Sequence, residues 1–90
     1  MKGIDDLRPR YLDNRKADLL ALATALEQND YPAIRTLGHN MKGTGKSYGF
    51  EAIGHIGACL EEAAQTQSGD QIRREISALT EYLSQVKVIR

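Results

Sequence analysis

Residues 37–50, LGHNMKGTGKSYGF, contain two side chains suited to handling a phosphoryl group. His39 carries an imidazole, which is largely neutral at pH 7 and whose free nitrogen can attack phosphorus. Lys42 follows three residues later, one turn away if the stretch is helical, and its ammonium would supply positive charge to phosphoryl oxygens. The same stretch contains GTGKS, which looks like the end of a nucleotide-binding phosphate loop. The segment therefore either holds a nucleotide or carries a phosphoryl group on its own histidine.

The phosphate-loop interpretation fails on pattern and on context. The motif G-x-x-x-x-G-K-[ST] needs a glycine five positions before Gly45, where this sequence has Asn40. It also needs a buried strand directly before the loop, and the preceding DYPAIRTLGH has no strand pattern. No later hydrophobic run ends in an aspartate that could hold magnesium. We therefore expect no nucleotide site here.

Apolar residues recur at helical spacing through the rest of the chain. The predicted helices span residues 7–26, residues 32–49, a segment after Phe50 and a last segment that reaches Val86. Asp30 is expected to cap the second helix, Gly69 to end the third and Asp70 to cap the fourth. The predicted core positions of the first, third and fourth helices are Leu12, Leu19, Ala23 and Leu26; Ile53, Ile56, Leu60 and Ala63 or Ala64; and Ile72, Ile76, Leu79, Leu83 and Val86.

Four such helices with short links predict an all-α fold, an antiparallel up-down four-helix bundle. Ninety residues make one domain, residues 1–90. Twelve basic and twelve acidic side chains cancel, so we expect neither a nucleic-acid nor a membrane partner. No apolar run approaches the roughly 20 residues of a membrane span, and the first residues, MKGIDDLRPRY, do not contain the apolar run that is typical of a secretion signal. The single cysteine, Cys59, excludes an internal disulfide, and we expect a cytoplasmic monomer.

The second helix is expected to expose His39. At 100° per residue, its apolar stripe lies about 140° to 220° away from the histidine. That stripe consists of Ile34, Leu37, Met41, Thr44 and Tyr48. Arg35, Lys42, Gly43 and Lys46 fall within about 60° of His39, so the histidine should lie in a cationic patch that faces solvent.

Glycines are unusually frequent in this helix, although each interior one costs up to about 1 kcal/mol relative to alanine. Gly38, Gly45 and Gly49 share one flank, where missing side chains would let a neighbouring helix approach closely. Gly43 lies one turn after His39 on the exposed side. We expect it to keep the surface beside the imidazole clear for another protein.

With these residues placed, the sequence closely resembles the histidine-containing phosphotransfer (HPt) domain family over about residues 11–83. The resemblance rests on His39, Lys42 and Gly43, then Gly49, then the Leu60–Glu61 pair. It implies a four-helix bundle whose exposed histidine accepts a phosphoryl group from the aspartate of a receiver domain and passes it to another receiver. His39 matches the phosphorylated histidine, and Lys42 and Gly43 match its companions.

Two positions depart from the usual look of the family. Tyr48 stands where a smaller aliphatic residue is common, and Lys46 is an additional cation. Both departures could alter partner choice. With Arg35, Lys46 is a candidate partner-binding residue.

Glu61 is a candidate for orienting His39. If the second and third helices turn near Gly49 and Phe50, His39 lies level with Leu60 and Glu61. The Glu61 carboxylate could accept a hydrogen bond from the ring N–H that is not used in attack, which would fix the tautomer. The alternatives are a solvated glutamate and a partner for Lys42.

Three functions remain in view. The first is a phosphoryl carrier without a nucleotide or metal site, whose partners are receiver domains of response regulators or hybrid sensor kinases and whose Mg²⁺ comes from the receiver. The second is a module of the same fold that docks a receiver or kinase without accepting phosphate. The third is a hydrolase that uses His39 or His55, although no nucleophile with a placed base is recognisable. His55 is expected to be a surface or boundary residue.

Overall fold

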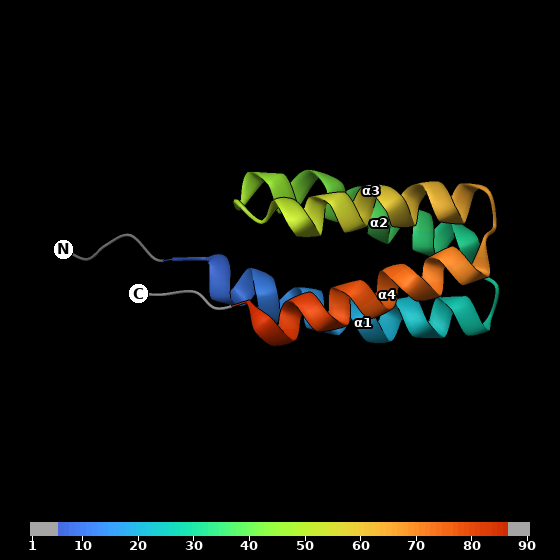
Figure 1. Ribbon diagram of the computed structural model, residues 1–90, viewed down its shortest axis with the longest axis horizontal. Helices are drawn as coiled ribbons and strands as arrows, with labels where there is room; N and C mark the ends of the chain where they lie inside the picture. The colour runs from blue at the N-terminus through green and yellow to red at the C-terminus, as the bar shows by residue number, and fades with distance from the viewer. Residues whose placement is uncertain (1–5, 87–90) are drawn as a thin grey trace.

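The computed structural model describes residues 6–86, which form four helices. They are α1 (Arg8–Glu27), α2 (Tyr31–Ser47), α3 (Glu51–Gln65) and α4 (Gly69–Gln85). Successive helices run antiparallel, with α2 and α3 in one layer and α1 and α4 in the other (Figure 1). The predicted all-α up-down bundle is confirmed. No helix within residues 6–86 is long and apolar enough to cross a membrane.

The start of α2 follows its sequence signals. Asp30 Oδ1 accepts a hydrogen bond from the Ala33 backbone N–H at 3.2 Å, and Pro32 lies in the first turn, where no N–H is needed. Asp30 is therefore the predicted N-cap. At the other end Gly49 adopts φ +85°, a left-handed conformation that glycine takes without strain. The chain thus reverses between α2 and α3 at Gly49.

The link between α3 and α4 differs from the prediction. Ser68, not Asp70, caps α4, and its hydroxyl accepts a hydrogen bond from the Gln71 N–H at 3.3 Å. Gly69 is the first residue of α4 rather than the end of α3, and Gln67 takes the left-handed conformation instead, with φ 57°. Asp70 lies in the first turn of α4 and pairs with Arg73 at 2.6 Å. Serine and aspartate both suit a helix start, and the serine two positions earlier takes the role.

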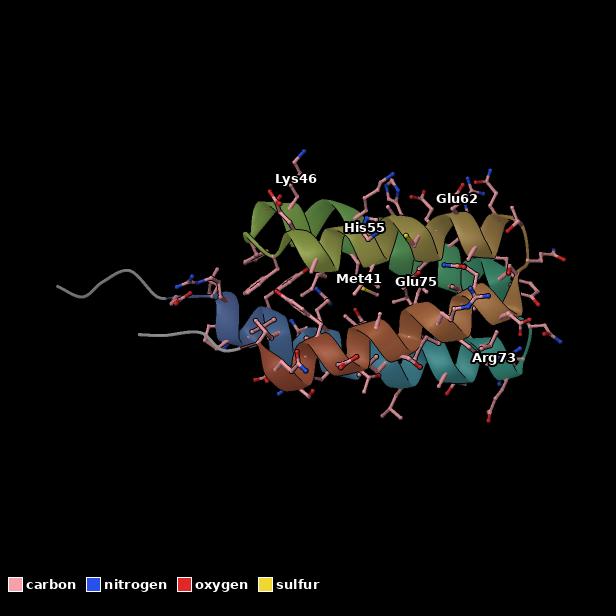
Figure 2. All side chains as sticks on the ribbon, viewed as in Figure 1. Met41, Lys46, His55, Glu62, Arg73 and Glu75 are labelled. Atoms are coloured by element: carbon pink, nitrogen blue, oxygen red, sulfur yellow. The ribbon has the colours of Figure 1, made fainter. Side chains whose placement is uncertain are left out.

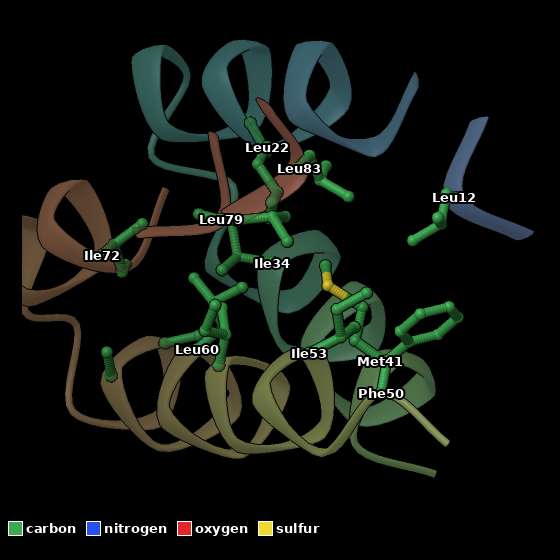
Figure 3. Close-up of a cluster of buried hydrophobic side chains, with 14 of the residues drawn as sticks. Leu12, Leu22, Ile34, Met41, Phe50, Ile53, Leu60, Ile72, Leu79 and Leu83 are labelled. Carbon is green, nitrogen blue, oxygen red and sulfur yellow. The ribbon is translucent and has the colours of Figure 1, made fainter. Parts of the chain in front are cut away.

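The core lies between the two layers (Figure 3). Its fully buried large side chains are Leu22, Ile34, Met41, Ile53, Leu60, Ile72 and Leu79. The predicted core faces of α2 and α3 are confirmed, and both Ala63 and Ala64 are buried. In α1 the prediction was partly wrong, because Ala23 is exposed while Leu22 and Ala25 are buried. The second half of α1, LLALATALE, is apolar on all sides, so its periodicity does not identify the buried face.

Four glycines bring α2 and α3 into backbone contact. A Cβ atom on Gly38 would lie 2.7 Å from the backbone nitrogen of Glu61, and one on Gly57 would lie 2.6 Å from the Gly38 carbonyl oxygen. One on Gly45 would overlap the backbone of Gly54. The close approach predicted from Gly38 and Gly45 is thus present. Gly49 takes no part in it, because a side chain there would point into open space.

An aromatic cluster fixes α1 to the end of the α2–α3 pair. The Tyr11 ring stacks on Tyr48 with centroids 4.4 Å apart, and on Phe50 at 5.9 Å. The Tyr11 hydroxyl shares a 2.9 Å hydrogen bond with the Thr44 hydroxyl, and Arg15 lies over the same ring. Tyr48, which departs from the family pattern, therefore has a packing role.

Replacing Gly45 by alanine should destabilise the protein, while the same change at Gly43 should not. A methyl group at position 45 forces the α2 and α3 backbones apart, which we expect to cost about 1 to 3 kcal/mol and several degrees of Tm. A Cβ at Gly43 would meet no atom of another described element within 4 Å, so alanine there should add up to about 1 kcal/mol of helix stability. Urea and thermal unfolding followed by circular dichroism measure both changes. Equal stability of the two variants would contradict the tight contact.

Candidate functional site

His39, Lys42 and Glu61 meet on the outer face of α2 and α3. The Nδ1 atom of His39 lies 3.0 Å from Oε2 of Glu61, and Nζ of Lys42 lies 3.0 Å from the other oxygen, Oε1. The His39 side chain is 63% exposed, whereas that of Glu61 is only 20% exposed. One half-buried carboxylate therefore holds two exposed nitrogen groups, one with each oxygen.

The arrangement follows from helix geometry and from the register of the two helices. Lys42 is one turn after His39 on α2, so both side chains leave the helix on the same side. The turn at Gly49 brings Glu61 level with His39, as counting from the turn predicted. The missing side chain of Gly38 lets the Glu61 backbone lie directly against α2, so its short side chain reaches both partners.

The contact with Glu61 defines the tautomer of His39. An ionised carboxylate can only accept hydrogen bonds, so the Nδ1 atom that faces it carries the hydrogen. In the neutral ring this leaves Nε2 with a free lone pair. The ring nitrogen that is left with a free lone pair to act as a nucleophile is therefore Nε2.

The hydrogen bond from Lys42 is the main reason why the pKa of Glu61 lies below its usual value, and the hydrogen bond from His39 lowers it further. Partial burial raises the pKa of Glu61; its influence is weaker than that of the Lys42 hydrogen bond and stronger than that of the His39 hydrogen bond. Because a lowered pKa favours the ionised form, protonation of Glu61 requires a more acidic solution than for an ordinary glutamate. Glu61 is thus ionised at neutral pH and can bind both groups.

The surface around His39 contains the other predicted residues. Gly43 is exposed, and a side chain at this position would meet no atom within 4 Å. Arg35 and Lys46 are also exposed, and with His39 and Lys42 they follow each other at steps of four, three and four residues along α2. Within residues 6–86 neither Arg35 nor Lys46 pairs with a carboxylate. The structure therefore places both beside the site and outside the hydrogen-bonded group.

His55 and Cys59 form a separate pair on α3. His55 is exposed, as predicted, and its Nε2 lies 3.6 Å from the Cys59 sulfur. Burial raises the pKa of the Cys59 thiol, and the charges of Glu75 and Glu62 raise it further. The thiol is therefore protonated at neutral pH, which makes it a poor nucleophile.

The His39 site does not fit a divalent metal ion. Its single carboxylate is already occupied by an imidazole N–H and an ammonium, and Mg²⁺ prefers several oxygen ligands. Within residues 6–86, no three histidine, cysteine, aspartate or glutamate side chains gather in a way that could hold a metal. The expectation that Mg²⁺ comes from a receiver remains a prediction.

Two residues that matter for the site were missed from the sequence. Gly54 and Gly57 supply the α3 side of the backbone contact, and without them Glu61 would stand farther from α2. The signal was available, because two glycines three residues apart inside an apolar helical segment indicate a close approach.

Comparison with known families matches residues 6–88 to the family described as "Hpt domain". The match covers nearly the whole chain and is wider than the resemblance over residues 11–83. Comparisons with curated proteins and with solved structures found no match. Domains of this family are phosphocarriers that interact with receiver domains or kinases. The chain belongs to the Hpt domain family, which has a phosphotransfer role in two-component signalling.

Proposed function

We propose that this chain is a phosphorelay intermediate in which Nε2 of His39 accepts a phosphoryl group from the aspartyl phosphate of one receiver domain and passes it to the aspartate of another. The observation that carries the proposal is the exposed imidazole whose Nδ1–H is held by Glu61. That contact leaves one nitrogen free, on a surface that another protein can reach.

The transfer needs no group beyond these two proteins and the receiver's metal ion. The Nε2 lone pair forms a bond to phosphorus while the bond from phosphorus to the aspartyl oxygen breaks, and the aspartate leaves as a carboxylate. The ring becomes positively charged and keeps its hydrogen on Nδ1. Glu61, 3.0 Å away, stabilises this charge. The reverse step returns the ring to its neutral state.

Lys42 is proposed to stabilise the phosphoryl group. Its ammonium has three hydrogens, and Glu61 accepts only one in the resting state. The other two ammonium hydrogens can reach the oxygens of a phosphoryl group on His39, which lies one turn earlier on α2. Lys42 thus binds the phosphoryl group without releasing Glu61, which keeps the histidine oriented during transfer.

Gly43 is proposed to provide clearance, and Arg35 and Lys46 to contact the partner. The phosphoryl donor and acceptor are receiver domains of response regulators or hybrid sensor kinases, whose acidic pockets would bind Mg²⁺. The chain itself would act as a carrier without an ATP site. That it is monomeric and cytoplasmic also remains a prediction.

Phosphotransfer profiling tests the proposal. Each receiver domain of the source organism is phosphorylated with a small-molecule phosphodonor and mixed with the chain. We expect at least one receiver to label the chain with phosphate that is labile in acid and stable in base. Binding without labelling by any receiver would instead support the docking module that does not accept phosphate.

His39→Gln should abolish this labelling, because no other ring nitrogen is both free and placed beside Lys42 and Glu61. The melting temperature should stay within about 2 °C of wild type, since an exposed side chain is replaced. His55→Gln is the matched control, because it removes the other imidazole of the sequence, and it should still become labelled at saturating receiver. A labelled His39→Gln variant would show that the acceptor lies elsewhere.

Lys42→Ala and Gly43→Leu should both slow transfer, for different reasons. Loss of the ammonium should reduce the rate about 10- to 100-fold, or roughly 1.4 to 2.7 kcal/mol, with little change in receiver affinity. A leucine at position 43 should instead weaken receiver binding, because it fills the space that the partner enters. Single-turnover rates and receiver dissociation constants separate the two effects. The opposite pattern would contradict the assigned roles.

Glu61→Ala should remove the tautomer preference of His39. We expect ¹⁵N NMR of the ring to show a smaller fraction with hydrogen on Nδ1, and transfer to slow by about 10-fold. Glu62→Ala, a change at the exposed neighbouring glutamate, is the control and should alter neither quantity. A wild-type tautomer ratio and rate in Glu61→Ala would leave this residue without an orienting role.

A further inference from the structure

A second charged hollow lies one turn beyond the phosphoryl site. It has a volume of about 330 Å³ and is lined by Lys42, Lys46, Glu51, Gly54 and His55. We call it the cationic hollow. Lys46 projects from the α2–α3 layer on the side away from α1 and α4 (Figure 2), and His55 is exposed on α3. The hollow therefore belongs to the same outer face as His39.

The floor of the cationic hollow is formed by the close contact between the two helices. A Cβ atom on Gly54 would lie 3.3 Å from the Lys42 carbonyl oxygen and 3.5 Å from the backbone nitrogen of Lys46. Because no side chain intervenes, the α2 backbone lies directly on α3 at this point. The Lys46 and His55 side chains therefore line one recess, although they come from different helices.

The charge of this region is positive and only partly balanced. Arg35, Lys42 and Lys46 are basic, and α2 contains no acidic residue, although the whole chain is neutral. Lys42 has Glu61 as its partner, whereas Lys46 pairs with no carboxylate within residues 6–86. Among residues 6–86, Glu51 is the one acidic side chain that lines the hollow. A lysine in the last turn also favours the helix dipole, but that role requires no recess beside it.

The hollow on the other side of His39 has a different character. It has a volume of about 550 Å³ and is lined by His39 and Glu61 together with Tyr31, Pro32, Arg35 and Ala64. Tyr31, Pro32 and Ala64 contribute aromatic and aliphatic groups to its wall, the rest of the lining is polar and includes Thr36, Gln65 and Gln67, and Glu61 there is already paired. The phosphoryl site thus lies between two recesses that suit different side chains.

We infer that the cationic hollow determines partner specificity by taking an acidic side chain of the docking receiver domain at Lys46 and His55. The inference rests on the proposed phosphorelay function and adds the chemistry of the partner's surface. Lys46 lies two turns from His39 and makes no contact with the reacting atoms. Its contribution is to the encounter and the orientation of the complex, since complementary charges raise association rates and disfavour wrong partners.

The test uses a receiver that labels the wild-type chain in the profiling experiment. Lys46→Glu is compared with Arg74→Glu, which makes the same change in net charge on α4, in the other layer. We expect Lys46→Glu to weaken receiver binding about 10-fold at low salt, with a smaller loss near 1 M salt, where charges are screened within about 3 Å. The transfer rate at saturating receiver should equal that of wild type. His55→Gln should weaken binding less, and Glu51→Gln should strengthen it by removing the opposing charge.

Changing acidic surface residues of the receiver to lysine, one at a time, then identifies the contact. One such variant should restore wild-type affinity toward Lys46→Glu and bind the wild-type chain poorly. Equal affinities of Lys46→Glu and Arg74→Glu, or rescue by no receiver variant, would overturn the inference and leave the phosphorelay function intact. If no receiver labels the wild-type chain, the proposed function fails and the inference fails with it. Melting curves establish that each variant is folded.

Discussion

The contact between α2 and α3 without intervening side chains is the constraint on which the arrangement of His39, Lys42 and Glu61 depends. Glycines at positions 38, 45, 54 and 57 let one helix backbone lie on the other. Glycine inside a helix costs about 1 kcal/mol relative to alanine. The four glycines therefore lower the stability of α2 and α3 and, in return, allow the two backbones to come into contact. Glu61 benefits directly, because its backbone nitrogen lies against Gly38 and its side chain can reach across to His39 and Lys42. A wider spacing would leave the carboxylate hydrated and the imidazole free to rotate.

Helices α2 and α3 contribute their inner faces to the core and their outer faces to the site of His39, Lys42 and Glu61. Met41 and Leu60 are buried between the layers, one position away from Lys42 and Glu61 on the outer face. Packing of the inner side chains fixes the rotation of each helix, and that rotation determines where the outer side chains point. The positions of His39, Lys42 and Glu61 are therefore set before any partner binds, although all three are at least partly exposed to water.

Much of this could be predicted from the sequence because the informative segments have a single apolar stripe. The core face of α2 and the register of Glu61 followed from spacing and from the turn at Gly49. The buried face of α1 did not, since leucines and alanines surround its second half and Leu22 could not be distinguished from Ala23 by periodicity. The cap of α4 was also missed, because Ser68 and Asp70 are both chemically suitable. Only the geometry of the α3–α4 link distinguishes the two.

Orienting His39 and pairing with Lys42 are compatible roles for Glu61, because its carboxylate contacts both side chains. A carboxylate has two oxygens, and here each one accepts from a different partner, His39 or Lys42. The same negative charge fixes the ring and holds the ammonium within one turn of the nitrogen that would carry phosphate. When His39 accepts a phosphoryl group, its ring gains a positive charge. The Glu61 carboxylate then faces two cations, the His39 ring and the Lys42 ammonium. In the proposed loaded state the ring carries one positive charge and the phosphoryl oxygens carry two negative charges, so the site gains one net negative charge and Lys42 is the cation that faces the phosphoryl oxygens.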